Sequence, residues 1–324
     1  MKAVQFKEFG GPEVLQYVDL EQPKPSGREV VLDVKAIGVN FADTARREGQ
    51  YVVETKLPFI PGAEVAGVVA EVGPDVKHVK VGDRVVTLIE SKGYAEYTLT
   101  HEKTLIPIPE GVDFETAVAL PLQGLSAYHI LKTMGRLEEG ETVLVHAAAG
   151  GVGTIAVQLA KIFGAGKIIA TASTDEKLQH AKNMGATYLV NYTQEVWEQE
   201  VLDLTDGEGV DVALEMVGGD IFKQTLKCLA PFGRLVIYGV ASRVQPKLNP
   251  SYLMGKNQSV IGFFLPQIMR KQELFQQSLK ELLTYLQTGQ LKLTIGGVYE
   301  LSEAQKVHEL LEGRRTKGKL VLKP

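Results

Sequence analysis

The chain contains 324 residues, carries a net charge of −4 and has a single cysteine. This length suits two domains, and 44% hydrophobic with 23% charged residues is typical of a soluble globular protein. The acidic balance and the lack of a Lys/Arg-rich run argue against binding to nucleic-acid phosphates. The single thiol, Cys228, excludes an internal disulfide and a zinc site built from several thiolates.

The N-terminal stretch "MKAVQFKEFGGPEVL" has no apolar core of signal-peptide length. No stretch approaches the ~18 uncharged apolar residues that a membrane span needs. We therefore expect a cytoplasmic protein with no membrane partner.

Short strands broken by Gly and Pro dominate the first third of the chain. The apolar pattern predicts strands at 30–39, 64–73, 82–89 and 94–100. Such a density of short strands and turns is typical of a small barrel or sandwich and not of a parallel sheet.

From residue 122 the pattern changes to alternating strands and helices, beginning with a helical apolar spacing over 122–131. The strands are nearly continuous apolar runs, as in a parallel sheet covered on both faces. We predict strands at 142–147, 167–172, 188–192, 210–217, 233–239 and 259–264, with helices at 152–163 and 175–184. This alternation predicts a doubly wound, Rossmann-type α/β domain.

After residue 265 an amphipathic helix ends at Gly289, and a short strand, "KLVLKP", closes the sequence. If this strand returns to the first domain, the Rossmann-type domain is an insertion. We therefore predict a discontinuous, mainly β domain of residues 1–122 and 266–324, and a Rossmann domain of residues 123–265.

The glycine turn between strand 142–147 and helix 152–163 predicts a dinucleotide site. A helix N-terminus attracts a pyrophosphate, and glycines let the phosphate approach the backbone. The pattern G-x-G-x-x-G/A fits in two registers, one with Gly151, Gly153 and Ala156 and one with Ala148, Gly150 and Gly153. The residues alone leave both registers open.

The end of the next strand favours NADP over NAD. An NAD site usually has an acidic residue there, whereas this strand ends at Ala172 and Ser173, with Lys177 shortly beyond. A hydroxyl and an ammonium suit a 2′-phosphate, although Asp175 and Glu176 weaken the inference. The alternative is a solvated first helical turn capped by Ser173 or Thr174.

At this point the chain resembles the zinc-independent quinone oxidoreductases (zeta-crystallin-like) of the medium-chain dehydrogenase/reductase superfamily. The resemblance covers nearly the whole sequence. It rests on "MKAVQFKEFGGPEVL", "GVNFADTARREGQY" (38–51), "LPFIPGAEVAGVVAEVG" (57–73), "VGDRV" (81–85), "HAAAGGVG" (146–153), "GRLVIYG" (233–239) and "KGKLVL". It implies a GroES-like catalytic domain beside the Rossmann domain, and it places Ala148, Gly150 and Gly153 in the three positions of the turn.

The resemblance also implies a set of cofactor-binding residues. The turn at Gly150, Gly151, Val152 and Gly153 would meet the pyrophosphate, and Ser173, Lys177 and Tyr192 would surround the 2′-phosphate. Gly239, Val240, Phe263, Phe264 and Leu265 would border the nicotinamide. Lys319 stands at a position that relatives use for pyrophosphate.

Zinc alcohol dehydrogenases of the same superfamily have metal ligands where this chain has Asn40, Ala63 and Leu122. An amide, a methyl and an isobutyl group cannot form a tetrahedral zinc site of sulfur and nitrogen ligands. We therefore expect no metal, and a carbonyl polarised by hydrogen bonds alone. This suits an electron-poor acceptor, such as a quinone or a conjugated enone.

Four residues are candidates for the chemistry. Asn40 and Tyr51 can each donate a hydrogen bond to the acceptor, and a structural role in the loop is the alternative for each. Asp43 is expected to orient donors near Asn40, and the Ser126 hydroxyl to reach the nicotinamide or its ribose. By contrast, we interpret His129 and His146 as structural, and Trp197 and Cys228 as packing residues.

We predict an NADPH-dependent, zinc-free quinone reductase whose site lies in the cleft between the domains. The resemblance also suggests a homodimer, joined through the strand at 259–264. One alternative is an NADPH-dependent reductase of α,β-unsaturated aldehydes or ketones. Another, of a different class, is an NADPH-binding protein with a structural, sensing or RNA-binding role.

Overall fold

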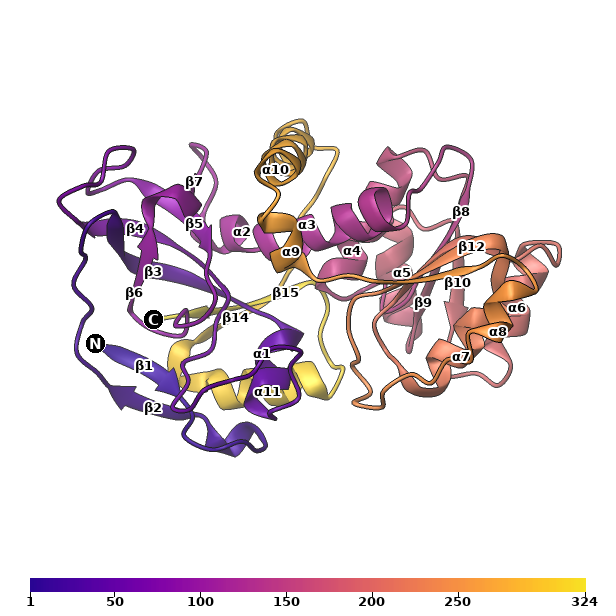
Figure 1. Cartoon of the computed structure of the whole chain (residues 1–324), viewed down its shortest axis with the longest axis horizontal. Helices are drawn as coiled ribbons and strands as arrows, with labels where there is room; N and C mark the ends of the chain where they lie inside the picture. Colours follow the sequence, from indigo (N-terminus) through magenta and orange to yellow (C-terminus); the bar gives the residue numbers. More distant parts are fainter. The chain divides into compact units, whose positions relative to one another are not determined.

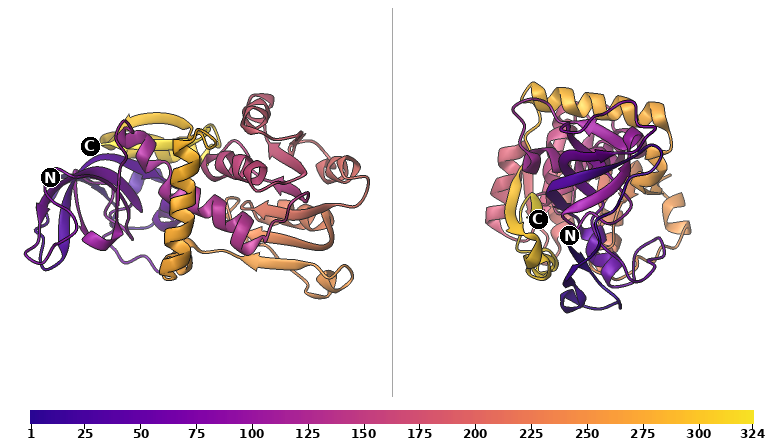
Figure 2. Two further views of the ribbon diagram at one scale, coloured as in Figure 1. Left: turned by 90° about the horizontal axis from the view of Figure 1, so that it is seen from above. Right: turned by 90° about the vertical axis from the view of Figure 1, so that its left-hand side faces the viewer.

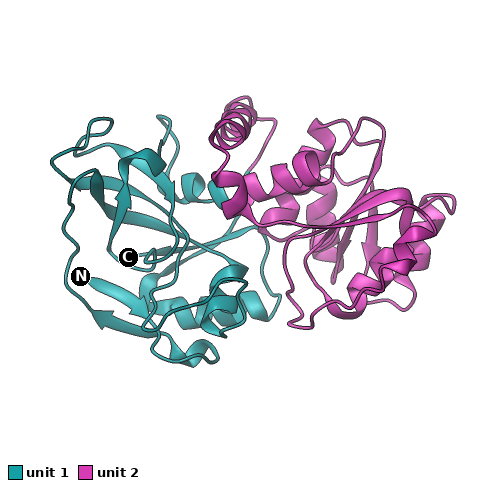
Figure 3. Cartoon of the chain, in the orientation of Figure 1, with its two compact units in different colours: residues 1–122, 293–324 teal, residues 123–292 magenta.

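Strand β15 (Lys319–Lys323) returns from the end of the chain to pair with β3 (Glu29–Val39). In the computed structural model, which describes all 324 residues, this pairing joins the end of the chain to its N-terminal part (Figure 1). The chain divides into unit 1, Met1–Leu122 with Leu293–Pro324, and unit 2, Gln123–Lys292 (Figure 3).

Unit 1 is a mainly antiparallel β structure. Its large sheet has the order β14-β15-β3-β4-β5-β7, with β6 also paired to β3, and β1 pairs separately with β2. The remaining strands are β1 (Lys2–Gln5), β2 (Gln16–Asp19), β4 (Glu64–Val72), β5 (Arg84–Leu88), β6 (Tyr97–His101), β7 (Leu105–Pro107) and β14 (Ile295–Glu300). Its helices are α1 (Phe41–Arg47), α2 (Phe114–Val118) and α11 (Ala304–Glu312), with short turns η1 (Pro12–Val14), η2 (Glu102–Thr104) and η4 (Leu301–Glu303).

The core of unit 1 draws on both ends of the chain. Val30, Leu32 and Ile37 from β3 pack with Val307 of α11 and Leu322 of β15, all of them buried. Burial of this apolar surface joins the C-terminal segment to the N-terminal sheet.

Unit 2 contains a six-stranded, fully parallel sheet with the order β10-β9-β8-β11-β12-β13. The strands are β8 (Thr142–Val145), β9 (Lys167–Ala172), β10 (Tyr188–Asn191), β11 (Val210–Glu215), β12 (Leu229–Ile237) and β13 (Ser259–Gly262). The order reverses between β8 and β11, which is the switch point of a Rossmann fold. The predicted fold class is therefore confirmed.

Helices precede, connect and follow these strands. They are α3 (Pro121–Tyr128), a π-helical turn η3 (His129–Met134), α4 (Gly151–Ile162), α5 (Asp175–Met184), α6 (Trp197–Leu204), α7 (Gly219–Lys227), α8 (Ser251–Met254), α9 (Leu265–Met269) and α10 (Gln272–Gln287). Helices α4 and α5 pack together, as do α6 and α7. None of the helices combines the length and apolarity that a bilayer crossing requires.

The second domain boundary differs from the predicted one. It falls after Lys292 and not after residue 265, because α9 and α10 belong to unit 2. The long helix α10, seen at full length in Figure 2, is fastened there by polar contacts. The Ser278 hydroxyl lies 3.0 Å from His129 Nε2, and Glu281 accepts from the Tyr128 hydroxyl at 2.9 Å. Sequence patterning identified the helix but not the partner that binds it.

Candidate active site

The glycine turn of unit 2 leads from β8 directly into α4. Ala147 adopts a left-handed φ of 49°, and its carbonyl accepts from the Gly150 N–H at 2.8 Å, which tightens the turn. Gly150 is the residue before the helix, and no side chain caps the helix N-terminus. The first-turn N–H groups of a helix have no partner within the helix. This end of α4 is therefore built to hold an anion.

The three glycines of the turn have different surroundings. A Cβ on Gly153 would lie 2.3 Å from the Ala147 carbonyl oxygen, so this glycine permits close packing of helix and strand. A Cβ on Gly151 would overlap the side chain of Gln123, at 2.1 Å. A Cβ on Gly150 would meet only the Ala147 oxygen, at 3.2 Å. The close-packing role of Gly153 fits the register with Ala148 in the first position.

The other predicted cofactor residues of unit 2 follow the carboxyl ends of its strands. Ser173 follows β9 and Tyr192 follows β10, whereas Gly239 and Val240 follow β12 and the group Phe263, Phe264 and Leu265 follows β13. Because all six strands are parallel, these ends share one edge of the sheet with the glycine turn. The structure thus gathers the unit 2 residues of the predicted site at one edge, and their contacts with a cofactor stay a prediction.

The residues considered for the 2′-phosphate lie on either side of the start of α5. Ser173 precedes the helix, and Lys177 belongs to it. Thr174 caps the helix, since its hydroxyl accepts from the Lys177 N–H at 3.4 Å. Asp175 and Glu176 occupy the first turn, where acidic residues complement the helix dipole. The cap is therefore Thr174, and Ser173 lies outside the helix on the strand side.

In unit 1, Asn40 lies in a buried polar cluster with Glu64 and Lys319, all at most 5% exposed. The Lys319 ammonium donates to the Glu64 carboxylate and, at 2.8 Å, to the Asn40 amide oxygen. The other Glu64 oxygen accepts from the backbone N–H of Leu122 at 3.0 Å. Asn40 and Leu122, two of the three residues that the sequence resemblance matched to zinc-ligand positions, thus bind one carboxylate here.

The Asn40 side chain has little donor capacity left. Its amide nitrogen lies 2.9 Å from Glu64 Oε1 and 3.2 Å from the Gly38 carbonyl oxygen, both of which are acceptors. Lys319 can only donate, which fixes the amide oxygen on its side. Both amide hydrogens are therefore engaged, and of the two roles considered for Asn40 the geometry favours the structural one.

Like the amide of Asn40, the ammonium of Lys319 is engaged by contacts within this cluster. Its side chain is 1% exposed, and its ammonium is held by Glu64 and Asn40. These contacts are those of a positive charge that neutralises the buried Glu64 carboxylate. Binding of pyrophosphate by Lys319 stays a prediction.

The Asp43 carboxylate binds backbone N–H groups near Asn40, and its expected role in orienting donors stays a prediction. Asp43 is buried at the start of α1, where its carboxylate accepts from the backbone N–H groups of Asn40 at 2.9 Å and Gly62 at 3.3 Å. Burial raises the pKa of Asp43 to about 6, against the lowering effect of these hydrogen bonds and of Lys319. Tyr51 follows soon after α1, and the Arg46 guanidinium lies 4.3 Å from its ring centroid.

Ser126 lies on α3 and is 6% exposed. The predicted reach of its hydroxyl toward the cofactor stays a prediction, as does the cleft between the domains.

The structural interpretation of the two histidines is supported. His146 lies 2.8 Å from the hydroxyls of both Thr171 and Thr225, and His129 contacts Thr133 and Ser278. Both ring nitrogens of each are engaged, and burial lowers the pKa of each ring to about 4. Trp197 and Cys228 are buried in the core of unit 2, as predicted.

Sequence reasoning missed Glu64, Arg47, Tyr94 and His308. Glu64 was visible as the residue after Ala63 in "GAE", and its charge within an apolar strand was the available signal. The other three are widely separated in sequence and meet only in the folded unit. No group of three or more His, Cys, Asp or Glu residues is arranged to hold a metal ion.

Comparison with known proteins identifies the relatives of this chain. Residues 26–110 match the alcohol dehydrogenase GroES-like domain, and residues 151–284 match the zinc-binding dehydrogenase domain. A quinone oxidoreductase of Pseudomonas aeruginosa is 39% identical, with 100% of this chain and 99% of the relative covered. The quinone oxidoreductase of Homo sapiens is 36% identical over 99% of this chain and 97% of its own.

This chain belongs to the quinone oxidoreductase family of the medium-chain dehydrogenase/reductase superfamily. It is an oxidoreductase. The crystal structure of the Escherichia coli quinone oxidoreductase complexed with NADPH aligns with this family member at a TM-score of 0.95. The two are 36% identical, and each chain is fully covered.

The residues present in this family member fit a dinucleotide. The α4 N-terminus has no capping side chain, and the Cβ position of Gly150 meets a single protein atom within 4 Å. Apart from that atom, the space around this Cβ position is open. This is the cradle that a pyrophosphate requires.

Proposed function

We propose that this chain is an NADPH-dependent, zinc-independent reductase of quinones. The observation that carries the proposal is the chemistry of the Asn40–Glu64–Lys319 cluster. At a position matched to a zinc ligand this chain has Asn40, and its amide, the Glu64 carboxylate and the Lys319 ammonium satisfy one another. Such a donor set supplies no Lewis acid, so the acceptor must already be electron-poor. The names of the relatives support a quinone.

In this proposal the residues of unit 2 hold the cofactor. The N–H groups of Gly151, Val152 and Gly153 bind the pyrophosphate, and Ser173 and Lys177 bind the 2′-phosphate. NADPH, when bound, supplies two electrons as a hydride. The Escherichia coli structure with NADPH supports this choice of cofactor.

In unit 1 the hydrogen bond to the acceptor comes from Tyr51. A phenolic hydroxyl can donate a hydrogen bond, and the contacts of Asn40 favour a structural role for that residue. Burial raises the pKa of Tyr51, an effect that Arg46 opposes and Asp43 strengthens. The hydroxyl therefore stays protonated at neutral pH and can stabilise a developing oxyanion.

The test is oxidation of NADPH by the purified protein with ortho- and para-quinones, compared with α,β-unsaturated aldehydes and ketones. Quinone-dependent turnover supports the proposal. Preference for the enones would instead identify a double-bond reductase. Tight binding of NADPH with no turnover of any acceptor would point to a structural or sensing role.

Zinc independence has its own test. Metal analysis of the active protein is expected to find no stoichiometric zinc, and a chelator is expected to leave activity intact. Loss of activity on chelation, with recovery on adding zinc, would refute zinc independence but not quinone reduction.

We also propose a homodimer joined through β13, which is the edge strand of the unit 2 sheet. The Phe263 N–H donates to Ile237 of β12, so by alternation the Val260 N–H faces the free edge. Val260→Pro removes that donor and is expected to shift the protein to monomer in sedimentation experiments, whereas Val260→Ala keeps it. A wild-type monomer would refute this assembly.

A further inference from the structure

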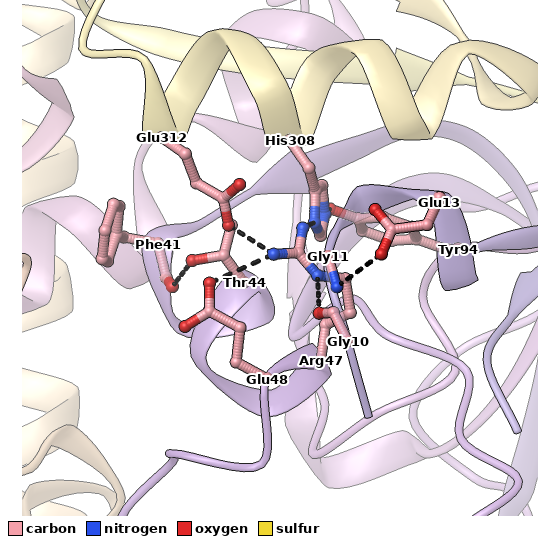
Figure 4. Close-up of polar contacts among 10 residues, drawn as sticks. All are labelled: Gly10, Gly11, Glu13, Phe41, Thr44, Arg47, Glu48, Tyr94, His308 and Glu312. Carbon is pink, nitrogen blue, oxygen red and sulfur yellow. Dashed lines mark hydrogen bonds and ion pairs between the residues drawn. The ribbon is translucent and has the colours of Figure 1, made fainter. Parts of the chain in front are cut away.

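A buried chain of polar side chains runs through unit 1 from Arg47 to Asp43 at the start of α1. Figure 4 shows its members Arg47, His308 and Tyr94. Arg47 Nη1 lies 3.2 Å from His308 Nδ1, and His308 Nε2 lies 3.1 Å from the Tyr94 hydroxyl. That hydroxyl lies 3.3 Å from Asp43 Oδ2, which accepts from the Asn40 N–H. Arg47, His308, Tyr94 and Asp43 are each at most 2% exposed.

The hydrogen bonds among these polar side chains all donate in one direction, from Arg47 towards Asp43. A guanidinium can only donate, so His308 Nδ1 must accept from Arg47. The proton of the neutral ring is then on Nε2, which donates to the Tyr94 oxygen. Burial, with the charge of Arg47 as a second cause, lowers the pKa of His308 to about 3 and keeps the ring neutral. The Tyr94 hydrogen is thereby left to donate to Asp43.

Arg47 also fastens the ends of two helices. It is the last residue of α1, and its Nη2 contacts Glu48 at 3.1 Å and Glu312, the last residue of α11, at 2.5 Å. Its Nε donates to the Gly10 carbonyl at 3.0 Å. Only the planar, five-donor fork of arginine can serve all these acceptors and His308 together.

The segment held in this way leads to Tyr51. Asp43 fixes the first turn of α1, and Arg47 fixes the last. The chain then turns through Gly49, whose φ is 71°, with the Gln50 N–H bound to the Ala45 carbonyl at 2.8 Å. Arg46, the neighbour of Arg47, lies over the Tyr51 ring. Tyr51 thus lies four residues after the anchored Arg47.

We propose that Arg47, His308 and Tyr94 are positioning residues for Tyr51. This inference rests on the proposed function, in which the Tyr51 hydroxyl donates to the acceptor. The directed chain keeps Asp43 as an acceptor at one end of α1, and the guanidinium holds the other end. Together they restrict the positions that the Tyr51 hydroxyl can reach, and catalysis is sensitive to such placement.

The main test is Tyr94→Phe, which removes one oxygen from the middle of the chain and changes the packing least. The kcat for quinone reduction is expected to fall roughly tenfold. The Kd for NADPH, measured by titration, is expected to stay unchanged because the predicted cofactor residues of unit 2 are untouched. The control is Tyr17→Phe, at a half-exposed tyrosine of the same unit. A fall in kcat no larger than that of the control overturns the proposal.

A second pair of variants guards against a packing effect. His308→Gln retains a donor and an acceptor on one side chain, whereas His308→Leu retains neither. The glutamine variant is expected to keep several times more of the wild-type kcat than the leucine variant. Equal losses would show that His308 acts through packing alone.

A double-mutant cycle then asks whether Tyr94 acts through Tyr51. In the Tyr51→Phe background, Tyr94→Phe is expected to change kcat by roughly twofold or less, because the two residues share one effect. Full additivity of the two losses overturns the proposal.

Hydrogen exchange separates this proposal from the proposed function. Amide exchange in residues 40–51 is expected to rise in Tyr94→Phe and not in Tyr17→Phe. If Tyr51→Phe leaves kcat unchanged, the catalytic role of Tyr51 fails, yet the exchange result still reports on positioning. Unchanged exchange in Tyr94→Phe would overturn the positioning role whatever the activity.

Discussion

Lys319 and Glu64 lie 255 residues apart in sequence and form an ion pair from which water is excluded, since their side chains are 1% and 0% exposed. Each charge also has a neutral partner, the Asn40 amide oxygen for Lys319 and the Leu122 N–H for Glu64. A buried charge is tolerated when it is paired and hydrogen-bonded in this manner. The pair therefore ties β15 to β4.

Lys319→Met is predicted to lower the free energy of unfolding by about 3–5 kcal/mol, because the Glu64 charge would remain buried without its partner. Chemical denaturation measures this loss. Lys323→Met is the matched control, since Lys323 ends the same strand and pairs with Glu115 at the surface. A similar, small effect for both variants would show that burial adds nothing to the pair.

Gly150→Ala and Gly153→Ala are predicted to fail in different ways. At Gly153 the new methyl would lie 2.3 Å from a carbonyl oxygen, so the melting temperature should fall. At Gly150 the methyl meets little protein and would stand in the anion cradle, so NADPH binding should weaken by roughly tenfold while stability is nearly kept. Thermal melts and NADPH titrations measure the two effects. Gly255→Ala is the control, with nothing within 4 Å.

Lys177→Ala is predicted to raise the KM for NADPH about tenfold and to leave the KM for NADH nearly unchanged, because only NADPH carries the 2′-phosphate. Steady-state kinetics with both cofactors provide the measurement. Lys182→Ala, in the last turn of the same helix, removes an equal charge as the control. Equal effects on NADPH and NADH would remove Lys177 from the 2′-phosphate site.

Asp43→Asn is predicted to make the free energy of unfolding fall more steeply as the pH decreases from 6 to 4. The folded-state pKa of Asp43, about 6, exceeds the ordinary value of 3.8, so in this window the folded protein binds one more proton through Asp43. That uptake stabilises the fold as the pH falls. Removing it should add about 1.4 kcal/mol per pH unit to the slope of the unfolding free energy.

Between pH 4 and pH 6 the free energy of unfolding of the wild-type protein is expected to fall on acidification. The contribution of Asp43 alone has the opposite sign. Three buried histidines, His129, His146 and His308, have a folded-state pKa of about 4 or below, so the unfolded chain binds more protons and stability falls on acidification. Denaturation at several pH values gives both slopes. Identical slopes would mean that the Asp43 pKa is close to its ordinary value.

Local pattern predicted most of the fold. Predicted strand 167–172 coincides with β9, and the predicted helix 175–184 coincides with α5, which ends at Gly185 in a left-handed cap. These elements have a strong apolar period and clear end signals. The start of β12 was missed by four residues, because the left-handed Phe232 bends that strand at an irregular position that periodicity does not encode.

The site was predicted less completely than the fold. The glycine turn is contiguous in sequence, so its geometry is determined by a few neighbouring residues. The saturation of Asn40 depends on Lys319, and the chain from Arg47 to Asp43 depends on His308, which lies on a distant helix. Contacts of such sequence separation are fixed by tertiary packing, and a single sequence carries no local signal of them.

The return of β15 to β3 also sets an order for folding during synthesis. Unit 2 is one continuous segment and has all of its strands once Lys292 has emerged from the ribosome. Unit 1 begins first, but its sheet lacks β14 and β15 at one end, and Glu64 lacks its counter-charge, until Lys319 is made. Domains that fold as units during translation usually do so from the N-terminus. Here the insertion reverses that order, and the domain begun first is the last to close.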